Sequence, residues 1–215
     1  MQAFDSLSRN IQQYIYDKGW PSLTRIQNAA IKQVANTDHN LILSAPTASG
    51  KTEAAFIPAL NSVEDWETGL KVLYISPLKA LINDQFQRIS ELSAYLDIPI
   101  TPWHGEVSQA QKKKVVNQPK GILLITPESI EGMLVNRPGK AQHLFKGVEW
   151  IIIDELHSFL GTERGVHLQS LLQRISQFMQ APRFIAMSAT LNKKDFGYAK
   201  AFFGSQRDTD ILVDR

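Results

Sequence analysis

A short segment with the sequence Ala45-Pro46-Thr47-Ala48-Ser49-Gly50-Lys51-Thr52 separates two apolar runs. The run before it, 41–43, is aliphatic and predicts a buried strand, while the run after it, 53–56, has the spacing of a helix. A strand, a tight loop and a helix in this order are the context that a phosphate-cradling loop requires. The segment therefore predicts that the chain binds a nucleoside triphosphate.

Each part of this segment has a predicted role. Backbone N–H groups of the loop and of the helix N-terminus would meet phosphate oxygens, Lys51 would add a positive charge, and the Thr52 hydroxyl would bind Mg²⁺. The first position is Ala45, where the pattern G-x-x-x-x-G-K-[ST] has glycine. The alternative, a chance Gly-Lys-Thr at a helix start, is disfavoured by the flanking strand and helix. The residues assigned to the nucleotide are Thr47, Ala48, Ser49, Gly50, Lys51 and Thr52.

The composition is that of an ordinary globular protein, with 215 residues of which 43% are hydrophobic and 20% charged. There is no cysteine, which excludes a disulfide framework and a thiolate metal site and fits a reducing compartment. The N-terminus lacks the layout of a signal peptide, and no apolar run approaches the ~18 residues of a membrane span. We expect a cytoplasmic protein that has no membrane partner.

The net charge of +2 is mildly basic and does not by itself indicate nucleic-acid binding, because such a footprint requires clustered cations. The sequence has one cluster of this kind, Lys112-Lys113-Lys114. Its interpretation as the solvated face of a helix is favoured over a contact with nucleic acid.

Short aliphatic runs alternate with helical patterns along the chain. Helices are expected from Phe4 up to Gly19, where apolar residues recur at helical spacing, and at 25–35, 78–92 and 167–179. Strands are expected at 41–44, 72–76, 121–126, 150–154 and 184–188, with shorter candidates at 98–101 and 211–213. Continuously apolar strands that alternate with helices predict an α/β fold with a mainly parallel sheet covered on both faces. Ligands of such sheets bind at the carboxyl ends of the strands.

Two adjacent acids, Asp154 and Glu155, directly follow the aliphatic run 150–153. Acids at the carboxyl end of a strand suit an Mg²⁺–nucleotide site, so we assign Asp154 to the metal and Glu155 to the attacking water. Together with Lys51 they form the predicted catalytic group. Alone, the pair fits solvated loop acids equally well, but a phosphate loop in the same sheet favours the metal site.

Two further motifs gain meaning from their order along the chain. Gln27 precedes the phosphate loop, and a carboxamide can pair with both a donor and an acceptor on a base edge, as in adenine recognition. Ser188-Ala189-Thr190 ends the predicted strand at 184–188. Taken alone, the glutamine is typical of a helix surface and the three small residues are typical of a turn.

In this order, the motifs resemble the first RecA-like domain of superfamily 2 helicases over residues 4–203. Phe4 and Gln27 are similar to the Q motif, and 45–52 is similar to motif I in its A-x-x-x-x-G-K-T form, which accounts for Ala45. The resemblance implies a RecA-like P-loop three-layer sandwich with ATP and Mg²⁺ as ligands. Segments similar to motifs Ia, Ib, II (in a DExH form) and III follow: Ser76-Pro77-Leu78-Lys79-Ala80-Leu81, Thr126-Pro127-Glu128-Ser129, Asp154-Glu155-Leu156-His157 and Ser188-Ala189-Thr190.

Within the superfamily, the chain looks most like the large helicase-related (Lhr) group and its Ski2-like relatives. Two positions depart from the usual pattern: Ala48 stands where that group often has glycine, and Leu23 stands where a proline is common in the Q-motif segment. The second departure weakens the match of Gln27 to an adenine contact. The segments behind the resemblance are 76–81, 104–108, 126–129 and 161–168.

The resemblance also implies a surface that holds one strand of nucleic acid by its phosphates, in a sequence-tolerant and salt-sensitive way. Thr126 and Pro127 have the compatible structural role of N-cap and first residue of a helix, and Arg164 has the alternative of steadying the loop after motif II. The residues assigned to nucleic acid are Pro77, Lys79, His104, Gly105, Thr126, Pro127, Ser129 and Arg164.

The resemblance further assigns His157, Ser188 and Thr190 to coupling between the nucleotide site and motif III. The alternative for His157 is an ordinary packed or surface histidine. The predicted division of the chain is N-terminal helices with the Q-like motif at 1–36 and a RecA-like ATP-binding domain at 37–215.

Superfamily 2 motors hydrolyse ATP between two RecA-like domains, and arginine fingers of the second domain are worth ~10³ to 10⁵ in rate. We expect this chain to hold only the first domain, to bind ATP–Mg²⁺ and to turn it over slowly when alone. Its expected partners are single-stranded or partly duplex DNA or RNA and a second RecA-like domain of the same parent chain.

Two other functions are compatible with a phosphate loop. A binding or regulatory module without motor activity is disfavoured by the intact Lys51, Thr52, Asp154 and Glu155. An unrelated P-loop enzyme, such as a small-molecule kinase, is disfavoured by the Ser-Ala-Thr motif, the Q-like segment and the two Ser/Thr-Pro turns.

Overall fold

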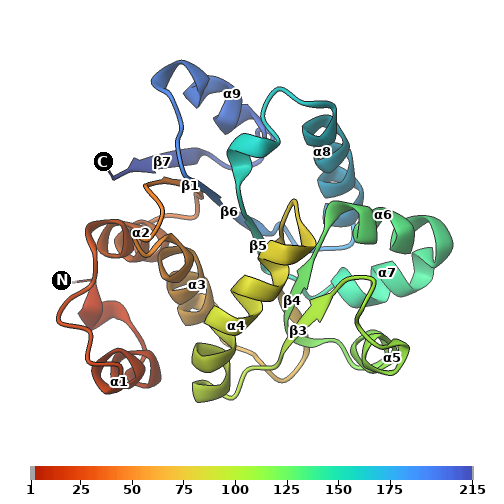
Figure 1. The fold of residues 1–215 in the computed structure, drawn as a ribbon, viewed down its shortest axis with the longest axis horizontal. Coiled ribbons are helices and arrows are strands. Elements are labelled where there is room, and N and C mark those ends of the chain that lie inside the picture. The colour runs from red at the N-terminus through yellow and green to blue at the C-terminus, as the bar shows by residue number, and fades with distance from the viewer. Residues whose placement is uncertain (1–2, 215) are drawn as a thin grey trace.

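The structure is a computed structural model that describes residues 3–214. A seven-stranded sheet runs through its middle in the order β3-β4-β2-β5-β6-β1-β7, and all neighbouring strands are parallel (Figure 1). The strands are β1 (Asn40–Ser44), β2 (Gly69–Ile75), β3 (Ile100–Trp103), β4 (Lys120–Ile125), β5 (Trp150–Ile153), β6 (Arg183–Ser188) and β7 (Thr209–Val213).

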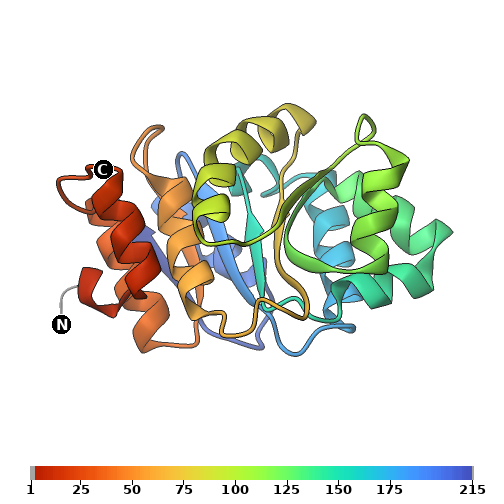
Figure 2. The same ribbon diagram turned by 90° about the horizontal axis from the view of Figure 1, so that it is seen from below.

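Helices cover both faces of the sheet (Figures 1 and 2), which confirms the predicted three-layer α/β sandwich. One layer consists of α1 (Arg9–Asp17), α2 (Arg25–Asn36), α3 (Lys51–Ser62) and α4 (Lys79–Tyr95). The other consists of α6 (Pro127–Asn136), α7 (Pro138–Phe145), α8 (Glu163–Ser176) and α9 (Phe196–Ala201), with α5 (Gln109–Asn117) beside α7. The 3₁₀ turns are η1 (Phe4–Ser6), η2 (Leu156–Ser158) and η3 (Lys193–Asp195). Within residues 3–214, no helix combines the length and the apolar character that crossing a bilayer requires.

Strand β5, near the middle of the sheet, is apolar at every position because both faces of the sheet are covered. In β5, Trp150 and Ile152 pack into the α1–α4 layer, whereas Ile151 and Ile153 pack into the α6–α9 layer. Successive side chains of a strand point to opposite faces, so a strand between two helical layers needs apolar residues throughout. This is the physical reason that continuous aliphatic runs identify the strands of this chain.

The parallel register brings the ends of the central strands to one edge of the sheet. Ser44 of β1 pairs with Ser188 of β6, and Ile75 of β2 pairs with Ile125 of β4 and Ile153 of β5. The loops that follow these residues carry the motifs predicted from the sequence. They therefore share the carboxyl edge, where ligands of parallel sheets bind.

The N-terminal helix differs from the prediction of one helix up to Gly19. The chain forms η1 and then α1, and Ser8 between them is extended, with φ −60° and ψ 152°. The Ser8 N–H donates to Oδ1 of Asn61 in α3 at 2.7 Å, a tertiary contact that holds the break. Leu7 and Ile11 are nevertheless buried in the same core. The apolar spacing thus predicted the buried face but not the interruption.

Several other element boundaries differ from the prediction, and local hydrogen bonds account for two of the differences. β3 begins at Ile100 rather than at 98, since the Ile98 N–H closes α4 by donating to the Ser93 carbonyl oxygen at 2.8 Å. α8 begins at Glu163 rather than at 167, because the Thr162 side chain caps it by accepting the Gly165 N–H at 3.0 Å.

The close approach at Gly165 allows a test of the packing between η2 and α8. A Cβ added to Gly165 would lie 1.9 Å from the Phe159 carbonyl oxygen, whereas one added to Gly132 in α6 would meet nothing within 4 Å. We expect Gly165→Ala to lower the free energy of unfolding by about 1–3 kcal/mol in urea titrations, because backbone must shift. The matched control, Gly132→Ala, should raise it by about 0.5–1 kcal/mol, since it only restricts the unfolded chain. Equal effects of the two variants would contradict the close contact.

Candidate nucleotide site and nucleic-acid interface

The segment 45–52 forms the loop between β1 and α3. Gly50 is the N-cap of α3 with φ 84°, and Ala48 also has a left-handed backbone, with φ 63°. For alanine this conformation costs on the order of 1 kcal/mol, so Ala48 keeps the backbone that glycine adopts readily. The loop and the first N–H groups of α3 thus lie at the carboxyl edge, in the arrangement that suits phosphate.

Lys51 folds back over this loop. Its ammonium donates to the carbonyl oxygens of Ala45 and Pro46, the second at 2.7 Å. Burial lowers the pKa of Lys51, while the charges of Glu155 and Asp154 act in the opposite direction. The ammonium therefore lies in the electrostatic field of both acids that follow β5.

Asp154 is a buried carboxylate, 6% exposed, at the end of β5. The Tyr74 hydroxyl donates to its Oδ2 at 2.5 Å, and the Glu155 N–H donates to its Oδ1 at 2.9 Å. Burial raises the pKa of Asp154, and the hydrogen bond from Tyr74 opposes that rise. Within residues 3–214, no lysine or arginine forms an ion pair with this carboxylate.

These oxygen donors fit a magnesium ion. Thr52 is buried in the first turn of α3, and Mg²⁺ is usually held by one or two carboxylates together with substrate phosphates and water. Among the residues described, no three His, Cys, Asp or Glu side chains gather into a metal cage. A metal held by Thr52 and Asp154 would therefore take its remaining ligands from the nucleotide and from water.

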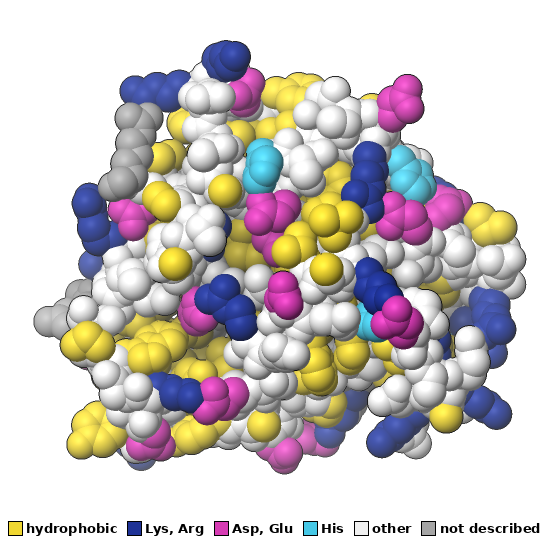
Figure 3. Space-filling view, in the orientation of Figure 1, with side chains coloured by type: hydrophobic (Ala, Val, Ile, Leu, Met, Phe, Trp, Pro, Cys, Tyr) yellow, Lys and Arg dark blue, Asp and Glu magenta, His cyan; other side chains and the backbone are white. Residues whose placement is uncertain are grey.

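A chain of polar contacts links the acids to the end of β6. Nδ1 of His157 lies 3.2 Å from Oε2 of Glu155 and 3.3 Å from Oγ of Ser188. The Ser188 hydroxyl also donates to the Thr190 carbonyl oxygen at 3.0 Å. Figure 3 shows acidic and histidine side chains side by side near the middle of this face. The structure thus brings the residues assigned to coupling together, and their role stays a prediction.

Gln27 lies against the phosphate loop rather than on a helix surface, and it is 3% exposed. Its Oε1 accepts the Thr24 N–H at 2.9 Å, which completes a capping box, and its Nε2 donates to the Gly50 carbonyl oxygen at 3.4 Å. One N–H and one lone pair of the carboxamide are left for a ligand. The contact with adenine stays a prediction.

Several residues assigned to nucleic acid lie on neighbouring loops of the same edge. Lys79 is the first residue of α4 and forms an ion pair with Glu106. Thr126 caps α6 by accepting the Ser129 N–H at 3.3 Å, and Pro127 is the first residue of that helix. The local roles predicted for Thr126 and Pro127 are confirmed, and phosphate binding stays a prediction.

Two other assigned residues, Arg164 and His104, make contacts within the domain. Arg164 donates to the Pro77 carbonyl oxygen at 2.5 Å and to Oε1 of Glu128 at 2.6 Å, so it ties the loop after β2 to α6. His104 is 7% exposed, and its Nε2 lies 3.0 Å from Oδ1 of Asn83. The His104 ring is buried beneath the turn, where Gly105 is exposed, and contact of this turn with nucleic acid stays a prediction.

Comparison with known proteins identifies the family. The family model for DEAD/DEAH box helicases matches residues 24–196. The chain belongs to this family. It is 30% identical to the ATP-dependent helicase Lhr-Core of Methanocaldococcus jannaschii over 98% of this chain and 26% of that protein. It is 33% identical to the Lhr helicase/uracil glycosylase of Escherichia coli over 88% of this chain and 13% of that protein.

The fold of this helicase domain agrees with the same group. A structure of the Mycobacterium smegmatis helicase Lhr bound to ssDNA and AMP-PNP superposes with a TM-score of 0.86 at 27% sequence identity, over 100% of this chain and 28% of that one. The chain thus spans about a quarter, or less, of the length of these relatives. The resemblance to Lhr-type superfamily 2 helicases is confirmed, and the domain is of the helicase ATP-binding type.

Sequence reasoning missed Tyr74, the one buried hydroxyl that donates to Asp154 among the residues described. The signal was present, because a tyrosine within the otherwise aliphatic end of β2 needs a hydrogen-bond partner for its hydroxyl. Which partner it finds depends on the pairing of β2 with β5, where Tyr74 is opposite Ile152. That pairing is not readable from the local sequence.

Tyr74 allows a test of the buried carboxylate in this helicase domain. Tyr74→Phe keeps the ring and removes a hydrogen bond to a charged group, so we expect the free energy of unfolding at neutral pH to fall by about 1.5–3 kcal/mol. Urea denaturation measures the change. Tyr198→Phe, at an exposed tyrosine of α9, is the control and should leave the stability unchanged. A Tyr74→Phe protein as stable as this control would show that the hydroxyl does not stabilise Asp154.

Proposed function

We propose that this domain binds ATP–Mg²⁺ and, within a longer motor, couples ATP hydrolysis to movement along single-stranded nucleic acid. One observation carries the proposal: the phosphate loop with Lys51, the acids Asp154 and Glu155, and the His157–Ser188 link lie together at one edge of the sheet. The similar Mycobacterium smegmatis Lhr was solved with ssDNA and AMP-PNP, which supports both ligand classes.

Each residue has a definite task in this proposal. The loop N–H groups and Lys51 hold the β- and γ-phosphates, while Thr52 and Asp154 hold Mg²⁺, which neutralises phosphate charge. Asp154 is a buried carboxylate with no ion-pair partner among residues 3–214. A divalent cation beside it therefore offsets the free-energy cost of burying its charge. Glu155 orients the attacking water, and Gln27 contacts the adenine.

Coupling to nucleic acid is assigned to the loops that share the edge. Lys79, Gly105, Thr126, Pro127 and Ser129 form the surface for the strand, held together by Arg164 and His104 from beneath. His157 touches both Glu155 and Ser188, so a change in the position of Glu155 shifts the hydrogen bond at the end of β6. A second RecA-like domain of the parent chain, a cytoplasmic location and DNA or RNA as the strand belong to the proposal.

Removing the ammonium of Lys51 tests nucleotide binding. We expect Lys51→Ala to weaken binding of a fluorescent ATP analogue with Mg²⁺ by at least about tenfold, since a charge-assisted hydrogen bond to phosphate is lost. The matched control is Lys200→Ala in α9, an exposed lysine remote from the loop. Unchanged affinity in Lys51→Ala would reject the phosphate site.

Exchanging Glu155 separates hydrolysis from binding. Glu155→Gln should bind ATP–Mg²⁺ within about twofold of the unchanged chain, yet reduce turnover by roughly 10²-fold or more, because the group that orients water is neutral. Turnover is measured as phosphate release with and without single-stranded DNA and RNA. Hydrolysis is expected to be slow in both proteins. Hydrolysis by Glu155→Gln at the same rate as by the unchanged chain would contradict the role of Glu155.

The same assays test the alternative of a binding module. If no nucleic acid changes the rate of ATP hydrolysis or the affinity for ATP–Mg²⁺, a binding module is favoured over a motor domain.

A further inference from the structure

A groove on the flank of the domain, between α5 and the pair α6–α7, extends beyond the residues assigned a role above. It consists of two adjoining hollows of about 260 Å³ and about 510 Å³ that share Trp103, Gln109, Lys112 and Arg137. We call it the flank groove and define it by Trp103, Gln109, Lys112, Lys113, Arg137 and Lys140. The wider hollow falls within the range of about 300–1,000 Å³ that is typical of ligand pockets.

The flank groove concentrates cations without carboxylate partners. No carboxylate of residues 3–214 forms an ion pair with Lys112, Lys113, Arg137 or Lys140, whereas Lys79 and Arg164 on the nearby motif loops do have one. The sequence explains the difference, because residues 107–148 contain seven Lys and Arg but only the acids Glu128 and Glu131. Both of these acids are engaged elsewhere, with Arg164 and Arg174 respectively. The groove therefore carries uncompensated positive charge.

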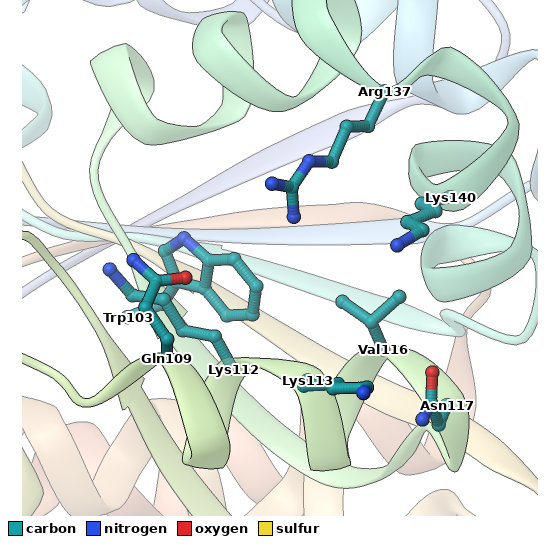
Figure 4. A pocket seen from close by; sticks show the side chains of 8 residues that line it. All are labelled: Trp103, Gln109, Lys112, Lys113, Val116, Asn117, Arg137 and Lys140. Carbon is teal, nitrogen blue, oxygen red and sulfur yellow. The ribbon is translucent and has the colours of Figure 1, made fainter.

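The cations converge on an aromatic side chain. In Figure 4, Arg137 and Lys140 point down from one wall toward Lys112 and Lys113 on α5, with the indole of Trp103 between the walls. Nζ of Lys112 lies 5.6 Å from the ring centroid of Trp103. Cations beside an aromatic ring are the combination that binds single-stranded nucleic acid without regard to sequence, by phosphate contacts and base stacking.

The flank groove is continuous with the surface assigned to nucleic acid. Ser129, in the first turn of α6, lines the wider hollow together with Gly132, Met133 and Asn136 farther along that helix. The narrower hollow extends to Asn117 and Lys140. Basic side chains also gather at the lower right margin of the face in Figure 3, over the region of α5 and α7. The groove thus begins at the carboxyl edge and descends along the flank.

We propose that the flank groove binds the phosphate backbone of single-stranded nucleic acid where the strand leaves the motif loops, with a base stacked on Trp103. This inference rests on the proposed function, since it requires a strand on Ser129. It also revises the interpretation of the lysine cluster: Lys113 and Lys114 are exposed to solvent as predicted, but Lys113 and the half-buried Lys112 also line the groove.

Two oligonucleotide lengths separate the groove from the motif loops. A strand of about 5 nucleotides covers the motif loops alone, whereas one of about 12 nucleotides also reaches the flank. For the double variant Lys113→Ala/Arg137→Ala, we expect the affinity for the longer strand to fall about tenfold and the affinity for the shorter strand to stay within twofold. For the longer strand, the slope of log Kd against log salt concentration should decrease by about 1 for each cation removed.

The controls distinguish this inference from the proposed function. Lys200→Ala removes an exposed cation of α9 and should change neither affinity. Lys79→Ala, on the motif loops, should weaken the binding of both oligonucleotides. If the double variant binds the longer strand as tightly as Lys200→Ala does, or loses affinity for both strands equally, the groove does not bind the strand. In that case only this inference is contradicted. If the unchanged chain binds neither strand, the proposed nucleic-acid function falls with it.

The fluorescence of Trp103 provides a second measurement. A purely structural role of this residue would not make its fluorescence respond to the bound strand. Binding of the longer strand should quench tryptophan fluorescence, and Trp103→Phe should lose most of that quenching while the shorter strand gives none in either protein. Thermal unfolding midpoints of all variants confirm that the fold is retained. Equal quenching by the longer strand in Trp103→Phe and in the unchanged chain would overturn the stacking contact.

Discussion

Burial of the parallel sheet on both faces is the constraint on which the rest of this structure depends. A strand between two helical layers is mostly apolar, and the βαβ crossovers place the strands parallel to one another in one sheet. Here the register pairs Ser44 with Ser188, and Ile75 with both Ile125 and Ile153, near the ends of their strands. The polar residues that follow are far apart in sequence, yet they meet at one edge without further adjustment.

The buried acid at this edge shows how the fold tolerates an unfavourable group. Asp154 is removed from water without an ion-pair partner among the described residues, and its charge is offset by hydrogen bonds from Tyr74 and the Glu155 N–H and, at longer range, by the Lys51 ammonium. The cost of an incompletely compensated charge is stored in the ligand-free domain. A cation that binds at Asp154 releases this cost, so part of its affinity comes from the fold itself. The left-handed backbone of Glu155, with φ 49°, is a second strained feature at the same place.

The sequence predicted the parts of the fold that depend on local patterns. The strands, the phosphate loop and the caps at Thr126 and Pro127 were recognisable because apolar runs and capping residues act over a few positions. The break at Ser8, the start of β3 and the burial of His104 were not, because each depends on a tertiary partner such as Asn61 or Asn83. The pairing of Arg164 with Pro77 and Glu128 was likewise hidden, since it joins segments brought together only by the sheet. For the same reason, the lysine cluster could be placed on a helix but not opposite Arg137.

The contact between Gln27 and Gly50 gives the N-terminal helices a mechanical connection to the phosphate loop. A Cβ added to Gly50 would lie 2.5 Å from Nε2 of Gln27, so α2 and the phosphate loop are packed too closely for a side chain at position 50. Gln27 belongs to α2, which shares its core with α1. Because Gln27 fills the space beside Gly50, the loop cannot move toward α2 without moving that helix. The N-terminal segment is therefore a support behind the phosphate loop that limits the positions open to it.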